Sequence, residues 1–347
     1  MRVLVLPVSG GGFTSQLAIM EHLCETHFVP DLTLASSGGN LAAYICSAAK
    51  WKWASIKRIA SELSQDIYAR PWNRNSWVTM VIGYFKGNAY NKGSGAYHFF
   101  MKYFDSETIG KYEIWTGTYN KERQKARLFC NRKESESCIN INLINKDLMQ
   151  SMDPVFADNQ IKLLSEVSMA SASIPSLVPC EIIEGEPYSD GGLSNASPLV
   201  ILKDSIYQKV RNENLPLHLI YVNSVDLSIP DIKPCKNIID SLKQIPHILV
   251  KSHVVNDRSA GYDLINLLGY DLINHQGYKI IFEEYKCDYD TLIIIQNIQK
   301  NVMYSLLEIY PMENNDINIV FFKGEDIVKS IEKCYEKCMC RFWRVDK

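Results

Sequence analysis

Three short motifs combine small residues with groups that can do chemistry. The first, SGGGF, begins at Ser9, directly after an apolar segment. Glycines there let backbone N–H groups turn outward at a helix N-terminus, where they bind an anion or stabilise charge that develops on a carbonyl oxygen. A dinucleotide site would instead need GxGxxG and an acidic residue about 20 positions further on, and Gly10, Gly12 and Ser15 match that pattern only in part. The glycine motif by itself leaves both uses open.

The second motif, ASSGG, contains a serine flanked by small residues. A nucleophile elbow is the sharp strand-to-helix turn that presents a catalytic serine, and it requires small residues two positions before and after that serine. Ser37 meets this requirement with Ala35 and Gly39, whereas Ser36 would place the bulky Leu34 in the turn. The spacing therefore favours Ser37 as the nucleophile. An ordinary Ser-Gly helix cap is the alternative interpretation.

The third motif is Asp190-Gly191-Gly192, which follows a short strand-like fragment. A carboxylate can project from such a position while the bare glycine backbone approaches another element. A simple turn is the alternative, because Asp-Gly turns are common. The run MASASIP, residues 169–175, lies just before it and would allow a helix to pack tightly beside the site.

Strand-like and helical segments alternate at the start of the chain. Apolar and β-branched residues favour strands over 2–8 and 31–36, and the hydrophobic periodicity predicts helices over 13–27 and 40–49. This order is typical of a parallel sheet covered by helices. We therefore expect an α/β fold.

The remainder of the chain continues this mixture. Further strands are expected over 112–119, 126–130, 139–143 and 217–222, with a helix over 159–174 that Pro175 ends. Beyond residue 230, the predicted helices cover 237–252, 258–275, 290–309 and 325–341, and the predicted strands cover 278–283 and 317–322. No strong linker separates these segments, so we expect one domain with a C-terminal extension.

Residues 50–104 differ from the rest in charge and in aromatic content. Four of the six tryptophans lie there, and the segment carries a charge of +7 (9 − 2) in a chain of net charge −2. The basic residues are Lys50, Lys52, Lys57, Arg58, Arg70, Arg74, Lys86, Lys92 and Lys102, against the acidic Glu62 and Asp66. Tryptophan, tyrosine and basic residues favour the surface of anionic membranes. The segment is expected to be a helical insertion, either an interfacial lid or rim or simply a packed core with charges facing water.

Composition excludes several classes of protein. Of the 347 residues, 46% are hydrophobic and 22% are charged, which is typical of a globular protein and excludes disordered and fibrous chains. The small negative charge argues against a nucleic-acid binder. The apolar runs are far shorter than the roughly 20 residues that span a bilayer, and no secretory pattern is present. We expect a soluble cytoplasmic protein, with peripheral membrane contact left open, that is not secreted.

The ten cysteines are expected to stay reduced and to act as small hydrophobic residues. Their one cluster is Cys334, Cys338 and Cys340, and cysteines so close together in sequence could hold a zinc ion. The cluster lacks both a CxxC pair and a nearby pair of histidines, so a helical tail is the favoured interpretation and no metal is expected.

Taken together, the motifs resemble those of the patatin-like phospholipases in order and separation. The matching segments are Gly10-Gly11-Gly12, residues 35–39, residues 170–175 and Asp190-Gly191-Gly192 with Asn195. The resemblance covers residues 1 to about 225. It implies a three-layer α/β/α fold with a mainly parallel sheet, in which residues 1–225, including the insertion 50–104, form the catalytic domain. Residues 226–347 are then a C-terminal α/β extension packed on the same domain.

The resemblance also implies an activity: hydrolysis of phospholipid acyl esters, as in a phospholipase A, through a Ser-Asp dyad and an acyl-enzyme intermediate. Ser37 would be the nucleophile and Asp190 the base that accepts its proton. The N–H groups of Gly11, Gly12 and Gly38 would form the oxyanion hole. No metal or organic cofactor is implied, although a calcium contribution to membrane docking stays open. The expected partners are an acyl lipid and a peripheral membrane surface, not a nucleic acid.

The chain departs from the family pattern at two places. Ala35 stands where the family usually has glycine, and Thr14-Ser15 stand where it has a basic residue followed by glycine. The first change is mild because the turn needs a small residue. The second change removes a basic residue, and this loss affects either the stability of the glycine turn or the recognition of an anionic group of the substrate.

Three alternatives remain at this stage. The chain could be a catalytically silent member that binds a membrane or a protein partner, or a nucleotide-binding protein that uses Gly10 to Gly12. A Ser-Asp-His triad could also replace the dyad. The histidines that follow Asp190 are His218, His247, His253 and His275.

Overall fold

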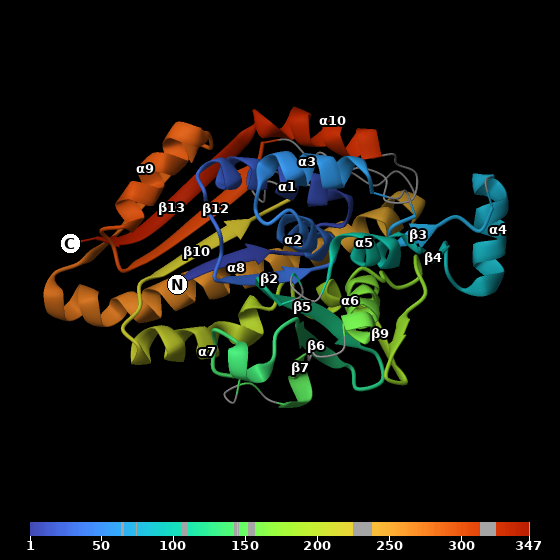
Figure 1. The fold of residues 1–347 in the computed structure, drawn as a ribbon, viewed down its shortest axis with the longest axis horizontal. Helices are drawn as coiled ribbons and strands as arrows, with labels where there is room; N and C mark the ends of the chain where they lie inside the picture. Colours follow the sequence, from blue (N-terminus) through green and yellow to red (C-terminus); the bar gives the residue numbers. More distant parts are fainter. Residues whose placement is uncertain are drawn as a thin grey trace.

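The computed structural model describes residues 1–346 except 64–65, 74, 106–107, 109, 142–143, 145, 152–156, 225–237 and 313–323. One sheet of eleven strands dominates the described part of the chain (Figure 1). Nine strands follow the order β11-β13-β12-β10-β1-β2-β5-β6-β7, and β9, which pairs with β8, joins the sheet through β5. The strands are β1 (Arg2–Leu6), β2 (Leu32–Ser36), β5 (Glu113–Asn120), β6 (Lys125–Cys130), β7 (Met149–Ser151), β8 (Glu181–Ile183), β9 (Glu186–Asp190), β10 (Leu217–Val222), β11 (Lys279–Lys286), β12 (Tyr304–Pro311) and β13 (Cys338–Asp346).

The centre of the sheet is parallel and its edges are antiparallel. Strands β12, β10, β1, β2 and β5 run in the same direction, whereas β13 and β11 on one side and β6 and β9 on the other pair antiparallel. The expected mainly parallel α/β fold is confirmed.

Helices cover both faces of the sheet, as the alternation of β1 shows. Leu4 and Leu6 belong to one core, which α1 (Phe13–Glu25), α2 (Gly38–Ala48) and α10 (Gly324–Tyr335) cover. Val3 and Val5 point the other way, into a second core under α7 (Leu199–Asn212) and α8 (Ile238–Gln276). Because each face of a buried parallel strand must be apolar, the result is three layers.

The segment 50–104 is largely helical. It contains α3 (Trp53–Ser61), α4 (Ser76–Lys86) and α5 (Gly95–Tyr103), together with a pair of short strands, β3 (Ala69–Arg70) and β4 (Asn91–Lys92). Helix α5 packs on α6 (Ala157–Ser171), whereas α4 stands apart from the other helices at the right-hand end of Figure 1.

Three sequence predictions in the middle of the chain need correction. Residues 139–141 are not a strand, and β7 lies further on, at Met149–Ser151; residues 142–143 lie outside the described part. The helices expected over 237–252 and 258–275 are one continuous helix, α8. Short apolar runs such as 139–143 do not by themselves distinguish strand from other buried structure.

Two further predictions extended helices through what are strands. The helix expected over 290–309 ends early, as α9 (Tyr289–Gln299), and is followed by β12. The helix expected over 325–341 is α10 followed by β13. Strand β12 is buried along its whole length, including the polar residues Ser305 and Glu308, so its sequence shows no alternation of apolar and polar residues. The strand expected over 317–322 lies outside the described residues.

The C-terminal part of the chain continues the sheet of the N-terminal part. Strand β12 pairs with β10 in parallel, and β13 and β11 follow it at the edge. The expected boundary at residue 225 falls in the segment 225–237, which is outside the described residues. In the part that is described, no helix is long and apolar enough to cross a membrane.

A buried glutamine holds together the carboxyl ends of two central strands. The Gln16 side chain on α1 is fully buried, and its Nε2 donates to the carbonyl oxygens of Pro7 (3.0 Å) and Val222 (3.1 Å). Pro7 follows β1 and Val222 ends β10. The glycine motif begins two residues after Pro7, so Gln16 helps to fix where that motif starts.

Replacing Gln16 should therefore destabilise the fold. Gln16→Leu would leave two buried carbonyl oxygens without a donor, and we expect the free energy of unfolding to fall by about 1–3 kcal/mol. Urea denaturation would measure this change, with Gln208→Leu on the exposed side of α7 as the matched control. An equal loss in both variants would contradict the anchoring role.

Candidate active site

The turn between β2 and α2 has the geometry of a nucleophile elbow. Strand β2 ends at Ser36, α2 begins at Gly38, and Ser37 between them has φ +55° and ψ −128°. A positive φ is unfavourable for a residue with a side chain, and such strain persists only where the surrounding structure imposes it. The sharp turn leaves Ser37 at the carboxyl edge of the parallel strands, where ligands bind in open α/β sheets.

The glycines after Ser37 are required by close backbone contact. A Cβ atom on Gly38 would overlap the carbonyl oxygen of Gly10, and one on Gly39 would overlap the carbonyl oxygen of Leu6. The first turn of α2 thus lies directly on the end of β1 and on the glycine motif. Both motifs near the N-terminus are parts of a single site.

The structure brings Ser37 and Asp190 into direct contact. Ser37 Oγ donates a hydrogen bond of 2.7 Å to Asp190 Oδ2, although the residues are 153 positions apart in the sequence. Asp190 Oδ1 accepts a second bond of 2.7 Å from the N–H of Gly192. The two side chains lie inside the protein, with Ser37 1% and Asp190 3% exposed.

Strand pairing and a glycine contact fix the position of Asp190. The residue ends β9, which pairs antiparallel with β5 so that Asp190 lies opposite Thr118. Its N–H donates to the carbonyl oxygen of Ser173 at 3.1 Å. A Cβ atom on Gly191 would overlap the carbonyl oxygen of Gly117, so the chain can pass there only as glycine. The Asp-Gly-Gly motif is therefore a close approach to β5.

Ser171 is a site residue to which the sequence reasoning assigned no role. Its Oγ accepts the N–H of Ser37 at 2.8 Å and donates to the carbonyl oxygen of Gly117 at 2.7 Å. Ser171 ends α6, so this helix holds the elbow from the side opposite to β1. From the sequence, the run MASASIP predicts close helix packing and matches a family segment, but it does not indicate this contact. The sequence feature that could have indicated the contact with Ser37 is the hydroxyl group of Ser171 within that run.

Burial changes the acidity of the candidate base. Because Asp190 is removed from water, its pKa is raised from 3.8 to about 6. The hydrogen bonds from Ser37 and from the N–H of Gly192 act in the opposite direction by stabilising the carboxylate. The carboxyl group is thus mostly ionised above about pH 6 and has a pKa close to that of an efficient general base at neutral pH.

The three predicted oxyanion donors differ in their surroundings. The N–H of Gly12 donates to the carbonyl oxygen of Ser9 at 2.8 Å and is therefore engaged within the turn. Gly11 lies in the same turn, which Gly10 enters with φ +52°. Gly38 starts α2, and the first N–H groups of a helix have no intrahelical acceptor. The geometry favours Gly11 and Gly38 over Gly12 as donors.

Position 14, where the family usually has a basic residue, is enclosed by the C-terminal part of the chain. Thr14 is fully buried, and its Oγ1 accepts a hydrogen bond of 2.8 Å from Ser330 Oγ on α10. Ser15 is also fully buried. A charged side chain at position 14 would point into the α1–α10 contact, so the threonine matches this packing.

Among the histidines after Asp190 whose side chains the structure describes, His218 lies far from Ser37. His218 is at the start of β10, beside Arg2 of β1, and its Nδ1 lies 3.0 Å from Ser305 Oγ. It is thus at the edge of the sheet opposite to Ser37. The side chain of His253 is half-buried on α8, and those of His247 and His275 lie outside the described part of the chain. The direct Ser37–Asp190 bond supports a dyad.

The C-terminal cysteines lie in the core and not on one helix. Cys334 belongs to α10, whereas Cys338 and Cys340 belong to β13, and Cys338 Sγ donates to the carbonyl oxygen of Cys334. Among the residues that the structure describes, no group of three or more His, Cys, Asp or Glu side chains is arranged to hold a metal ion.

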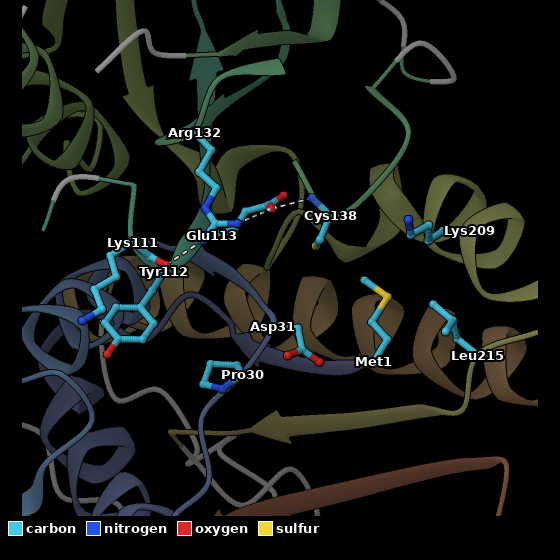
Figure 2. A pocket seen from close by; sticks show the side chains of 10 residues that line it. All are labelled: Met1, Pro30, Asp31, Lys111, Tyr112, Glu113, Arg132, Cys138, Lys209 and Leu215. Atoms are coloured by element: carbon cyan, nitrogen blue, oxygen red, sulfur yellow. Dashed lines mark hydrogen bonds and ion pairs between the residues drawn. The ribbon is translucent and has the colours of Figure 1, made fainter. Parts of the chain in front are cut away.

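A cavity of about 550 Å³ lies away from these residues, at the amino ends of β1, β2 and β5 (Figure 2). Its polar groups are engaged in structural contacts: Glu113 accepts hydrogen bonds from Trp115 Nε1 and from the N–H of Cys138, and Arg132 donates to the carbonyl oxygen of Gly110. Active sites of open α/β sheets lie at the opposite, carboxyl edge. We assign the cavity no role in the chemistry of Ser37.

Three comparisons with known proteins differ in what they find. The crystal structure of VipD from Legionella pneumophila aligns with 96% of this chain and 67% of that chain, at 8% sequence identity and a TM-score of 0.33, a likeness too distant to carry an argument. A comparison with curated proteins finds no match. The family model described as patatin-like phospholipase matches residues 6–203, which is more than half of the chain and includes Ser37 and Asp190. The chain therefore belongs to the patatin-like phospholipase family.

Proposed function

We propose that the protein is a lipid acyl hydrolase of the phospholipase A type. The observation that carries the proposal is the buried hydrogen bond of 2.7 Å from Ser37 Oγ to Asp190 Oδ2, at a strained strand-to-helix turn. A serine held in this way is activated by the adjacent base and attacks an ester carbonyl. Membership of the family, which acts on lipids, supports an acyl lipid as the substrate class.

The proposed reaction has two steps. Ser37 Oγ attacks the acyl carbonyl while Asp190 takes the hydroxyl proton, and the N–H groups of Gly11 and Gly38 stabilise the negative oxygen of the tetrahedral intermediate. Collapse of this intermediate breaks the ester bond, and the departing lysophospholipid oxygen receives the proton from Asp190. Water then attacks the acyl-enzyme while Asp190 again accepts a proton. Collapse of the second tetrahedral intermediate breaks the bond from the acyl carbon to Ser37 Oγ, which takes the proton back from Asp190, and the free fatty acid leaves.

The proposal includes a peripheral membrane surface as the source of the substrate and the cytoplasm as the location. Nine cysteines in the described part are free thiols, which is typical of proteins in a reducing compartment. Cell fractionation tests this: the chain should appear in the cytosol or on membranes from which salt releases it. Recovery from the secreted fraction would contradict the proposal.

Two substitutions test the dyad. We expect Ser37→Ala and Asp190→Asn each to abolish release of fatty acid from mixed phospholipids, as measured by mass spectrometry. Because the two residues act as one unit, the double variant should be hardly worse than either single variant. Ser36→Ala is the matched control, since the buried Ser36 hydroxyl has no hydrogen-bond partner among the described residues and its loss should leave most activity.

A covalent fluorophosphonate probe distinguishes an enzyme from the silent alternative. Labelling that Ser37→Ala eliminates and Ser36→Ala retains would support the hydrolase. If the intact protein is not labelled and releases no fatty acid, it is a binding protein. If Asp190→Asn keeps substantial turnover that a histidine substitution then removes, a triad replaces the dyad.

The acidity of Asp190 predicts the pH dependence. The base must be ionised, and burial raises its pKa to about 6, so kcat/KM should fall by about tenfold per pH unit below this value. Asp257 is the matched control, because its buried carboxyl group also has a raised pKa, about 7, yet it contacts Ser197 and Tyr221 instead of Ser37. Asp257→Asn should leave the acid limb in place. An acid limb near pH 4 would show that Asp190 does not titrate as proposed.

The glycine turn should affect the rate more than binding. Gly11→Val would place a β-branched side chain in the tight turn and pull the N–H away from the developing charge. We expect kcat to fall by roughly 10²–10³, the loss typical of removing one oxyanion donor, with KM nearly unchanged. An increase in KM at unchanged kcat would assign Gly11 to substrate binding.

A further inference from the structure

Helix α4 presents two different faces. Its inner face includes the small residues Thr79 and Gly83. Thr79 is buried and its Oγ1 donates to the carbonyl oxygen of Asn73, and a Cβ atom on Gly83 would overlap the carbonyl oxygen of Asn88. The opposite face carries Val81, which is 39% exposed, and Phe85, which is 81% exposed. Residues four apart lie on the same side of a helix, so these two form an apolar stripe directed away from the protein.

The charged residues in the sequence around this helix are all basic. From residue 67 to residue 104 the sequence contains no Asp or Glu, but it contains Arg70, Arg74, Lys86, Lys92 and Lys102. Lys92 pairs with Glu181 and Lys102 with Glu62. Arg70 and Lys86 are exposed, and the described part of the chain offers neither of them an ion-pair partner. Lys86 directly follows Phe85, so an exposed cation adjoins the exposed ring.

Helix α4 lies between the paired strands β3 and β4, and the residues that follow the helix are hydrogen-bonded to a segment near the candidate active site. The N–H groups of Ala89 and Tyr90 donate to the carbonyl oxygens of Ser176 and Leu177, each at 2.8 Å. Three residues before Ser176, the carbonyl oxygen of Ser173 accepts the N–H of Asp190. Two more apolar side chains are exposed along this path, Leu177 at 38% and Leu193 at 39%, the latter just after the Asp-Gly-Gly motif.

From these observations we propose that α4 is the membrane-docking element, which inserts Val81 and Phe85 into an anionic phospholipid bilayer while Lys86 and Arg70 lie among the headgroups. An apolar stripe bordered by cations matches the boundary between acyl chains and negative headgroups. The proposal rests on the proposed function, because it makes the lipid surface the partner of the same site. Docking at α4 would hold the segment 173–177 and the dyad beside the bilayer that contains the substrate.

The test measures binding apart from catalysis. Ser37→Ala protein is sedimented with phosphatidylcholine vesicles that contain phosphatidylserine, before and after adding Val81→Asp and Phe85→Asp together. Because burial of a large apolar side chain dominates such partitioning, bound protein should fall by at least about tenfold. Leu267→Asp on α8 is the matched control, since Leu267 is 57% exposed on another part of the surface, and it should bind as the parent does.

A separate variant measures how much the charge of Lys86 contributes to vesicle binding. Lys86→Glu should weaken binding to the phosphatidylserine vesicles, make it less sensitive to salt, and leave binding to phosphatidylcholine alone unchanged. Normal binding by the Val81→Asp, Phe85→Asp protein overturns the proposal, as does an equal loss in Leu267→Asp.

Folding and catalysis have their own controls. In the active protein, the α4 variants should keep the melting temperature and the hydrolysis of a short-chain soluble ester. If the melting temperature of the double variant falls, its weaker binding could reflect unfolding. The binding of Lys86→Glu then tests the proposal, because an exposed side chain can be replaced without loss of stability. If the parent hydrolyses no ester but binds vesicles through α4, the proposed function fails while the docking surface stands.

Discussion

The strained backbone of Ser37 is the constraint on which the rest of the site depends. A side chain at positive φ costs on the order of 1–3 kcal/mol, so neighbouring elements must impose that conformation. Helix α2 lies on the end of β1 through Gly38 and Gly39, and Ser171 accepts the Ser37 N–H from the other side. Gly38, Gly39 and Ser171 therefore hold the backbone of this one turn.

Burial of Asp190 raises the pKa of its carboxyl group at a cost in stability. An unfolded aspartate ionises near its ordinary pKa of 3.8, before the folded one with its pKa of about 6. Unfolding therefore releases a proton between about pH 4 and 6, and the stability of the fold decreases as the pH rises through that range. The bonds from Ser37 and Gly192 offset part of the penalty. Such a trade of stability for reactivity is common at functional sites.

The part of the chain beyond the family match contributes to the structure around the site. Strand β12 extends the parallel centre of the sheet beside β10, and α10 supplies Ser330 to Thr14 at the start of α1. Thr14 directly follows the SGGGF motif. The departure from the family at position 14 therefore coincides with a contact that the C-terminal segment makes.

The sequence by itself predicted the α/β class from the alternation of strand-like and helical segments, and it favoured Ser37 because an elbow restricts the residues around its serine. Asp190 was predicted from the resemblance of the motifs to those of the patatin-like family. The sequence misjudged β12, since a strand buried on both faces has no period of two to separate it from a helix. It also extended the helix that precedes β13 into that strand, although the burial of β13 alternates along much of its length. Only the tertiary structure decided that Ser37 and Asp190 touch across 153 positions and that Ser171 holds the elbow. Those contacts arise from the pairing of β9 with β5 and from the packing of α6. The hydrophobic pattern of a segment can indicate a strand or a helix, but it does not show which distant segment it will contact.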